Sequence, residues 1–256
     1  MVRTMPAYRG ARLKIKRANK HIEDVKAAIG FLKERLVVTA NINPHTGSEF
    51  IKCEFAELAD RESFENLPTL IGDAVHNLKC ALDHAWFETV CRLMPERDWE
   101  RARTKFPCVM SRKELEGALR KLEINITLPN FFNLILNEIK PYDGGDFAVR
   151  AVHELDLRDK HRLLIPTTHY SSIGDIYVED KSGRVHKGDT WGTDMPLPHF
   201  VEFETGLHIK DPGRASFEVM FQHGNASRET RAVDTLQLYS RFISKIVELL
   251  EEFRER

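Results

Sequence analysis

The sequence predicts an α+β fold, in which an up-and-down bundle of about four long helices carries an inserted β-hairpin and a C-terminal antiparallel β-sheet before the last helix. Two observations support this prediction. Apolar residues recur at helical spacing in four long segments, and segments with strand and turn signals follow the first of these and precede the last. The 256 residues contain no internal repeat or low-complexity linker, so we expect a single domain over residues 1–256.

The helices of the bundle core are expected at about 8–34, 69–93, 128–162 and 229–254. Pro68 stands in the first turn of the second helix, which stops before Pro95. In the third segment, one helix opens at Pro129 and ends at Pro141, and another runs from about 146 to 162. The four apolar faces can then share one core.

The β elements are expected at about 36–57 and 163–223. The first region reads as a hairpin, because two strand-like segments flank a turn at residues 43–47 that contains Asn, Pro and Gly. The second region contains strand-like segments with turn signals at residues 181–183 and 211–213. These segments predict a sheet beside the bundle.

Composition excludes any strong overall attraction to nucleic acid or membranes, since the net charge is −1 and the isoelectric point is near 6.8. An RNA contact would need a local basic patch, and residues 9–20, the basic stretch, hold six Lys and Arg residues. The alternative is an ordinary hydrated helix turn. The four cysteines form no CxxC pair, no secretory leader is evident and no apolar run approaches the ~18 residues of a membrane span. We therefore expect a cytoplasmic protein without a membrane partner.

The segment 69–93 has a polar face that is unusual for a hydrated surface. Hydrated faces are mostly Glu, Lys, Arg and Gln, whereas this face carries short polar groups, a thiol and imidazoles. At about 100° per residue, this polar strip consists of Asp73, Asn77, Cys80 and His84, with His76 and Asp83 along one edge. The pattern predicts a preorganised polar site on this helix.

A second polar group is expected on the helix at 146–162. Its members are Arg150, His153, Glu154 and His161, with Asp156, Asp159 and Lys160 flanking the second histidine. His76 and His84 are eight residues apart, as are His153 and His161. We expect the two helices to face each other and to place His84 within reach of residues 159–161.

Two segments, GDAVHNLKCALDH and ELDLRDKHR, resemble motifs of a group of uncharacterised bacterial proteins. That group typically shows GDxxHNLRxxLDH and DKHR motifs, an FP segment (Phe106-Pro107) and a PY segment (Pro141-Tyr142). The resemblance covers most of the chain and implies no established activity.

More distantly, the first segment is similar to the active helix of the HEPN superfamily, helical-bundle proteins that include many metal-independent ribonucleases. Their motif is Arg, four to six residues, then His. Lys79 and His84 match it, with Lys in place of Arg and Cys80 in place of the polar residue that commonly follows. The resemblance implies a homodimer that binds or cleaves RNA by metal-independent acid–base chemistry and needs no cofactor. Its catalytic residues would be His84 and Lys79, and we add His161 from the second polar group.

Two alternatives stay open, and with them the question of whether the protein is an enzyme. In the first, the protein is a non-catalytic interaction or ligand-binding module whose polar residues form buried networks. Lys79 is then a lysine whose stem covers apolar surface, and Cys80 is a small core residue. In the second, a metal-binding helical-bundle enzyme uses Asp73, His76, His84, Glu154 and His161 as ligands.

Overall fold

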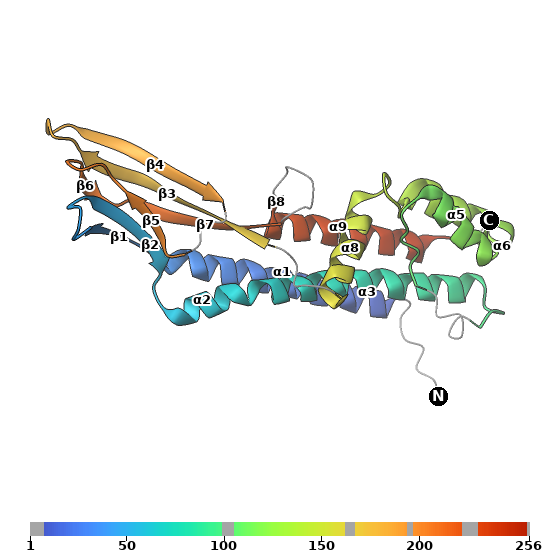
Figure 1. Ribbon diagram of the computed structural model, residues 1–256. Coiled ribbons are helices and arrows are strands. Elements are labelled where there is room, and N and C mark those ends of the chain that lie inside the picture. The colour runs from blue at the N-terminus through green and yellow to red at the C-terminus, as the bar shows by residue number, and fades with distance from the viewer. Residues whose placement is uncertain (1–7, 99–104, 162–166, 194–196, 222–229, 255–256) are drawn as a thin grey trace. The chain divides into compact units, whose positions relative to one another are not determined.

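The structure, a computed structural model, describes residues 8–98, 105–161, 167–193, 197–221 and 230–254 (Figure 1). The chain divides into two compact units. The helical unit comprises Met1–Glu23, Thr69–Ile165 and Asp234–Arg256, and the sheet unit comprises Asp24–Pro68 and Pro166–Val233. Helix α1 (Arg9–Glu34) begins in the first and ends in the second.

The helical unit contains α3 (Leu67–Leu93), α8 (Phe147–His161), α9 (Ala232–Glu252) and the first part of α1 (Figure 1). One side of α3 is fully buried and forms much of the core, with Ile71, Ala74, Val75, Leu78, Ala81, Leu82, Ala85, Trp86 and Val90. The Trp86 ring stacks on Phe131 at a centroid distance of 5.6 Å, and Phe106 packs against it at 6.0 Å in a T-shaped arrangement. The predicted apolar face of this helix is therefore confirmed.

Short helices connect α3 to α8. They are α5 (Arg112–Lys121), α6 (Ile124–Thr127), α7 (Pro129–Asn133) and the π-helix η1 (Leu134–Ile139). Ser111 caps α5, since its side chain accepts a hydrogen bond from the Glu114 N–H. Helix η1 ends at Lys140, whose backbone is left-handed with φ 53°. Gly144 (φ 81°) forms the following turn. This break separates η1 from α8.

The sheet unit contains two antiparallel sheets. The hairpin of β1 (Leu36–Ile42) and β2 (Glu49–Phe55) pairs with β5 (His199–Glu202) in a three-stranded sheet. The five-stranded sheet has the order β4-β3-β7-β8, with β6 paired to β3; its strands are β3 (Thr167–Glu179), β4 (Val185–Thr193), β6 (His208–Asp211), β7 (Arg214–Phe221) and β8 (Thr230–Arg231). Ile51 and Cys53 from one sheet share a core with Ile173 and Ile176 from the other. Helix α2 (Leu58–Glu65) follows β2.

The predicted fold class is wrong in its architecture, although α1, α3, α9 and the hairpin lie where the sequence placed them. The helices are not about four long ones, because the short helices α2, α5, α6, α7 and η1 accompany α1, α3, α8 and α9. The β segments do not form a hairpin plus one C-terminal sheet, because β5 leaves the C-terminal group to pair with β2. The single domain expected over residues 1–256 stays a prediction; within it the chain forms two compact units. Residues 162–166, 194–196 and 222–229 of the expected elements lie outside the described residues.

Among the described residues, the search for a helix both long enough and apolar enough to cross a membrane finds none.

Candidate functional site

Helix α3 runs antiparallel to α1. The Lys14 Nζ donates to Asn77 Oδ1 at 3.3 Å, and a Cβ at Gly10 would lie 3.0 Å from His84 Nδ1. Tyr8, just before α1, shares a 2.7 Å hydrogen bond between its hydroxyl and that of Thr89. These contacts place the α1 backbone directly against the His84 end of the polar strip.

Helix α8 runs antiparallel along another side of α3. A Cβ at Gly72 would lie 2.5 Å from Asp159 Oδ1, so only glycine allows this approach without a shift. One turn further along, His76 Nδ1 lies 2.9 Å from Asp156 Oδ1. The expectation that the two polar helices face each other is confirmed by these pairs.

The His76 ring connects two other groups of the site. Its Nδ1 faces the buried carboxylate of Asp156, and its Nε2 lies 3.4 Å from the Cys80 Sγ. With Asp156 ionised, the carboxylate can only accept, so Nδ1 carries the proton and Nε2 is left as an acceptor. The Cys80 S–H can then donate to Nε2. The three residues thus form a carboxylate–imidazole–thiol chain.

Lys79 is buried and forms an ion pair within α3. Its Nζ donates to Asp83 Oδ1 at 2.5 Å, and the side chains of Lys79 and Asp83 are 6% and 27% exposed. The same Asp83 oxygen accepts the Phe106 N–H at 3.0 Å. The Lys79–Asp83 pair therefore also holds the Phe106-Pro107 segment against α3.

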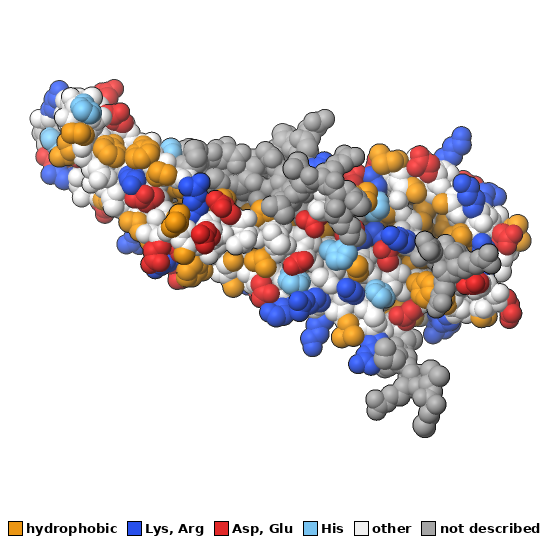
Figure 2. All heavy atoms as spheres, turned by 60° about the horizontal axis from the view of Figure 1, so that its bottom comes forward, with side chains coloured by type: hydrophobic (Ala, Val, Ile, Leu, Met, Phe, Trp, Pro, Cys, Tyr) orange, Lys and Arg blue, Asp and Glu red, His pale blue; other side chains and the backbone are white. Residues whose placement is uncertain are grey.

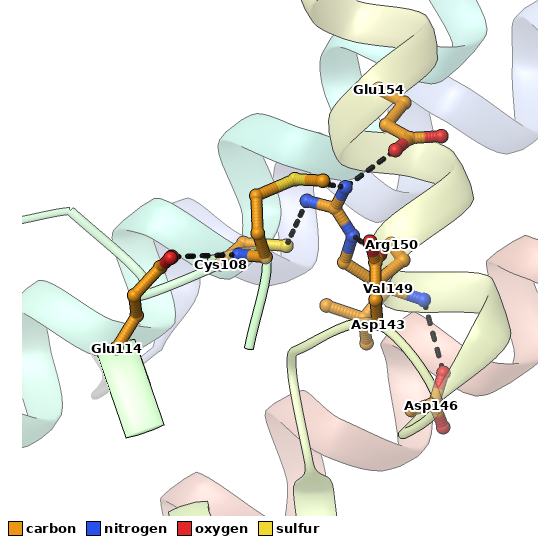
Figure 3. Close-up of polar contacts among 8 residues, drawn as sticks. Cys108, Glu114, Asp143, Asp146, Val149, Arg150 and Glu154 are labelled. Carbon is orange, nitrogen blue, oxygen red and sulfur yellow. Dashed lines mark hydrogen bonds and ion pairs between the residues drawn. The ribbon is translucent and has the colours of Figure 1, made fainter. Parts of the chain in front are cut away.

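Arg150 of α8 is buried and binds several groups (Figure 3). Its guanidinium donates to Asp143 Oδ1 at 2.6 Å and to Glu154 Oε1 at 2.5 Å. The same group reaches the Cys108 Sγ at 3.8 Å and the Met110 Sδ at 3.3 Å (Figure 3). Burial raises the pKa of the Cys108 thiol, while the hydrogen bond and charge of Arg150 oppose this. Arg150 thus joins α8 to the segment before α5.

His153 is half-buried beside these charged groups. Burial lowers the pKa of His153 below its ordinary value, and the positive charges of Lys79 and Arg150 lower it further, against the opposing effect of Asp156 and Asp83. Its Nδ1 is buried and has no hydrogen-bond partner among the described residues. The neutral imidazole is therefore the favoured form in this network.

The structure does not bring Lys79 and His84 together. Lys79 is buried toward α8, whereas His84 is exposed beside Gly10 of α1. Asp159 packs at Gly72, which is twelve residues before His84 on α3. The helical rise therefore separates Asp159 from His84 by roughly 18 Å along the axis of α3. The common site of His84 with residues 159–161 is therefore not formed by the described groups.

The remaining predicted residues divide between buried and exposed positions. Asn77 is buried and donates to the Asp73 carbonyl at 2.8 Å, while the Asp73 side chain is exposed. Glu154 is exposed, with 53% of its side chain accessible, and it pairs with Arg150. The side chains of Lys160 and His161 lie outside the described part of the structure.

No group of three or more His, Cys, Asp or Glu among the described residues is placed to hold a metal ion. The five alternative ligands are spread over α3 and α8, and the His76 ring is already engaged by Asp156 and Cys80. The described part of the site therefore gives the metal hypothesis no support.

Two connections were missed by sequence reasoning. Asp156 was noted only as a neighbour of the second histidine, yet it binds His76. Cys80 was placed on the polar strip, with a core position as the alternative, but its contact with an imidazole was not predicted. The spacing of His76 and Cys80, four residues apart on one helix face, could have signalled the second connection. The first depends on the register between two helices, which one sequence does not contain.

The face of α1 opposite the core is basic. Arg9, Arg12, Lys16, Arg17 and Lys20 are exposed, Lys14 is partly exposed, and residues 9–20 contain no acidic side chain. Figure 2 shows Lys, Arg and His side chains interspersed on one face of the helical unit.

A polar groove of about 620 Å³ adjoins this face between α1 and α9. It is lined by Asn19, Gln237, Ser240, Arg241, Ser244, Lys245 and Glu248. Ser240 donates from its hydroxyl to Asn19 Oδ1 at 2.5 Å, which ties the two helices at the groove floor. The lining adds two cations to those of the basic stretch.

Comparison with known protein families, curated proteins and solved structures finds no match for this chain. The function must therefore be argued from these side chains.

Proposed function

We propose that this protein binds RNA through the helical unit, as the distant HEPN resemblance implies. The observation that carries the proposal is the basic stretch on α1, which contains no acidic residue and in which five of the six cations are exposed. Arg12 is paired with Glu251 of α9, and Lys14 bonds Asn77 of α3. A phosphate backbone is recognised first by such charge, because bound cations release the counterions condensed on the nucleic acid.

The positions of the cations suit a single strand. Lys16 and Lys20 lie one turn apart, a spacing of about 6 Å along α1, which is close to that of successive phosphates. Arg241 and Lys245 repeat this spacing on α9, on the far side of the groove that Asn19 lines. A strand that follows α1 can therefore place further phosphates or bases in the groove.

We assign the buried ion pairs of Lys79 and Arg150 a structural role in this binding protein. The partners of Lys79 and Arg150 are side chains of the same unit, as expected for a network that fixes helix packing. This part of the proposal takes over the non-catalytic alternative. The expected homodimer stays a prediction.

Metal-independent cleavage of RNA is the second candidate, and one observation favours it. His84 of α3 is exposed and lies beside Gly10, which belongs to the basic stretch of α1. Glu88 lies beside the same glycine. An imidazole near a bound phosphodiester can transfer protons at neutral pH. The cations of α1 would then take the charge-stabilising part that the resemblance assigns to Lys79.

The test is fluorescence anisotropy with a labelled single-stranded RNA of about 20 nucleotides. We expect the double variant Lys16→Gln/Lys20→Gln to weaken binding about tenfold or more, since two phosphate contacts are lost. A matched variant, Lys113→Gln/Lys121→Gln, removes two exposed charges from α5 and should change Kd less than about twofold. Equal losses in both variants, or no binding by wild type, would overturn the proposal.

The second candidate is tested on the same RNA by gel electrophoresis in the presence of EDTA. Cleavage should persist in EDTA and be lost in His84→Ala, while Lys79→Met retains it. Intact RNA under all conditions, with binding preserved, would leave RNA binding as the function and remove cleavage.

A further inference from the structure

We propose that Cys80 is the nucleophile of an acyl-transfer site, with His76 as its general base and Asp156 as the residue that positions the imidazole. This site does not depend on the proposed RNA binding, although Lys14 of the basic stretch lies near it. The proposal rests on the carboxylate–imidazole–thiol chain, in which the distances from His76 are 2.9 Å to Asp156 and 3.4 Å to Cys80.

The local sequence explains this geometry. His76 and Cys80 are four residues apart on α3, so their side chains are neighbours on one face. Asp156 comes from α8, which the absence of a side chain at Gly72 allows close to α3. The nucleophile and base are thus on one rigid helix, and the orienting group is on another.

The exposure of the three groups fits their roles. The Asp156 side chain is 4% exposed, as suits a carboxylate that only orients, whereas the His76 side chain is 37% exposed and Cys80 is partly exposed. Neither His76 nor Cys80 is sealed in the core, in contrast to Asp156. Cys53 in the sheet unit is buried, and burial raises the pKa of its thiol to about 11.

The reaction follows from the positions of the protons. His76 Nε2 takes the proton from the Cys80 thiol, and the thiolate attacks the carbonyl carbon of an ester or thioester. A C–S bond forms to the enzyme, the bond from the carbonyl carbon to the leaving group breaks, and the leaving oxygen or sulfur takes the proton from His76. Water then attacks the acyl-enzyme, gives a proton back through His76, and releases the carboxylic acid and the thiol.

The surroundings favour an activated acyl group over an amide. The Cys80 N–H lies inside α3, where helix hydrogen bonds occupy such groups, so this turn offers no backbone oxyanion hole. The nearby cation is Lys14, which bonds Asn77 one turn from Cys80. A lone ammonium stabilises an oxyanion less specifically than two fixed N–H donors, so we assign activated esters and thioesters as the substrate class.

The test uses p-nitrophenyl acetate as the acyl donor, with release of p-nitrophenol followed by absorbance and the acetylated cysteine located by mass spectrometry. We expect Cys80 to be acetylated at least about tenfold faster than Cys91, a partly exposed thiol on the same face of α3. His76→Gln should slow acetylation of Cys80 about a hundredfold, since the general base is lost. The Cys80→Ala variant should lose the rapid p-nitrophenol release.

Asp156→Asn separates positioning from packing. The amide favours the other tautomer of His76, so acetylation should fall about tenfold or more, and Asp156→Glu should recover part of it. Thermal unfolding shows whether each variant is folded. If Asp156→Asn unfolds, the proposal is still tested by the ratio of the Cys80 and Cys91 acetylation rates in wild type and by the acetylation rate of His76→Gln. Equal acetylation of the two cysteines, or an unchanged rate in folded His76→Gln, would overturn the proposal.

Discussion

The ion pair of Lys79 and Asp83 predicts an asymmetric response to substitution. Lys79 is almost fully buried, while Asp83 is about a quarter exposed. Asp83→Asn leaves an unpaired ammonium in the interior, although the amide oxygen can still accept from Phe106. Lys79→Met removes the buried charge, retains much of the apolar stem, and leaves a carboxylate that water can reach.

The magnitudes follow from burial. Removing one partner of a buried pair costs about 3–5 kcal/mol, and the partial exposure of Asp83 places Asp83→Asn near the lower end. For a chain of this size, about 3 kcal/mol corresponds to a fall in Tm of roughly 6–12 °C. Lys79→Met should cost about 1 kcal/mol or less, because an apolar side chain replaces a buried cation.

Thermal unfolding at pH 7, followed by circular dichroism, measures both effects. The matched control is Glu116→Gln, which breaks the exposed i,i+4 pair with Arg120 on α5 and should cost about 0.5 kcal/mol or less. The reasoning fails if Lys79→Met is as destabilising as Asp83→Asn. It also fails if Lys79→Met abolishes RNA binding while the protein stays folded, since Lys79 would then act on the ligand.

Three further predictions concern the helical unit. Tyr239→Phe should leave Tm unchanged or raise it, because the buried Tyr239 hydroxyl has no partner among the described residues, whereas Tyr8→Phe should lower it by the equivalent of about 1–3 kcal/mol, because its hydroxyl binds three groups; the opposite order in a melting experiment would contradict this. The pKa of His153 is lowered on folding, so its contribution to stability is full above about pH 6.5 and is lost as pH falls through that value. Urea unfolding between pH 7.5 and 5.5 should therefore show a smaller loss for His153→Gln than for wild type, and parallel curves would refute the assignment. Gly72→Ala should be less stabilising than Gly117→Ala, because its Cβ would lie 2.5 Å from the Asp159 carboxylate on α8, which must then rotate away. Gly117 on α5 has open space around it, so Gly117→Ala should stabilise by up to about 1 kcal/mol, and equal Tm shifts would show that the close approach is not required.

The sequence was sufficient to locate the long helices, because each carries its own apolar periodicity. The buried side of α3, from Ile71 to Trp86, follows this periodicity. The pairing of the strands could not be predicted from such periodicity. Residues of β5 alternate between partly buried and exposed, so one face of the strand is covered. The pairing of β5 with β2, however, depends on the core around Ile51 and Cys53.

The candidate site shows the same limit. Composition and helical spacing were enough to single out the polar strip and the second polar group, because each lies on one helix. Which members meet depends on the relative register of α3 and α8, and this pairs His76 with Asp156 instead of bringing His84 to Asp159. In that register the Asp159 carboxylate lies against Gly72, and a glycine in a helix does not reveal which residue it faces.

The salt dependence of RNA binding tests the central claim most directly. Each neutralised phosphate on a single strand contributes about 0.7 to the slope of log K against log salt concentration. The wild-type slope should therefore be negative, and Lys16→Gln/Lys20→Gln should reduce its magnitude by about 1.4, while Lys113→Gln/Lys121→Gln leaves it unchanged. A slope near zero for wild type, or the same slope in the α1 variant, would contradict RNA binding through the basic stretch.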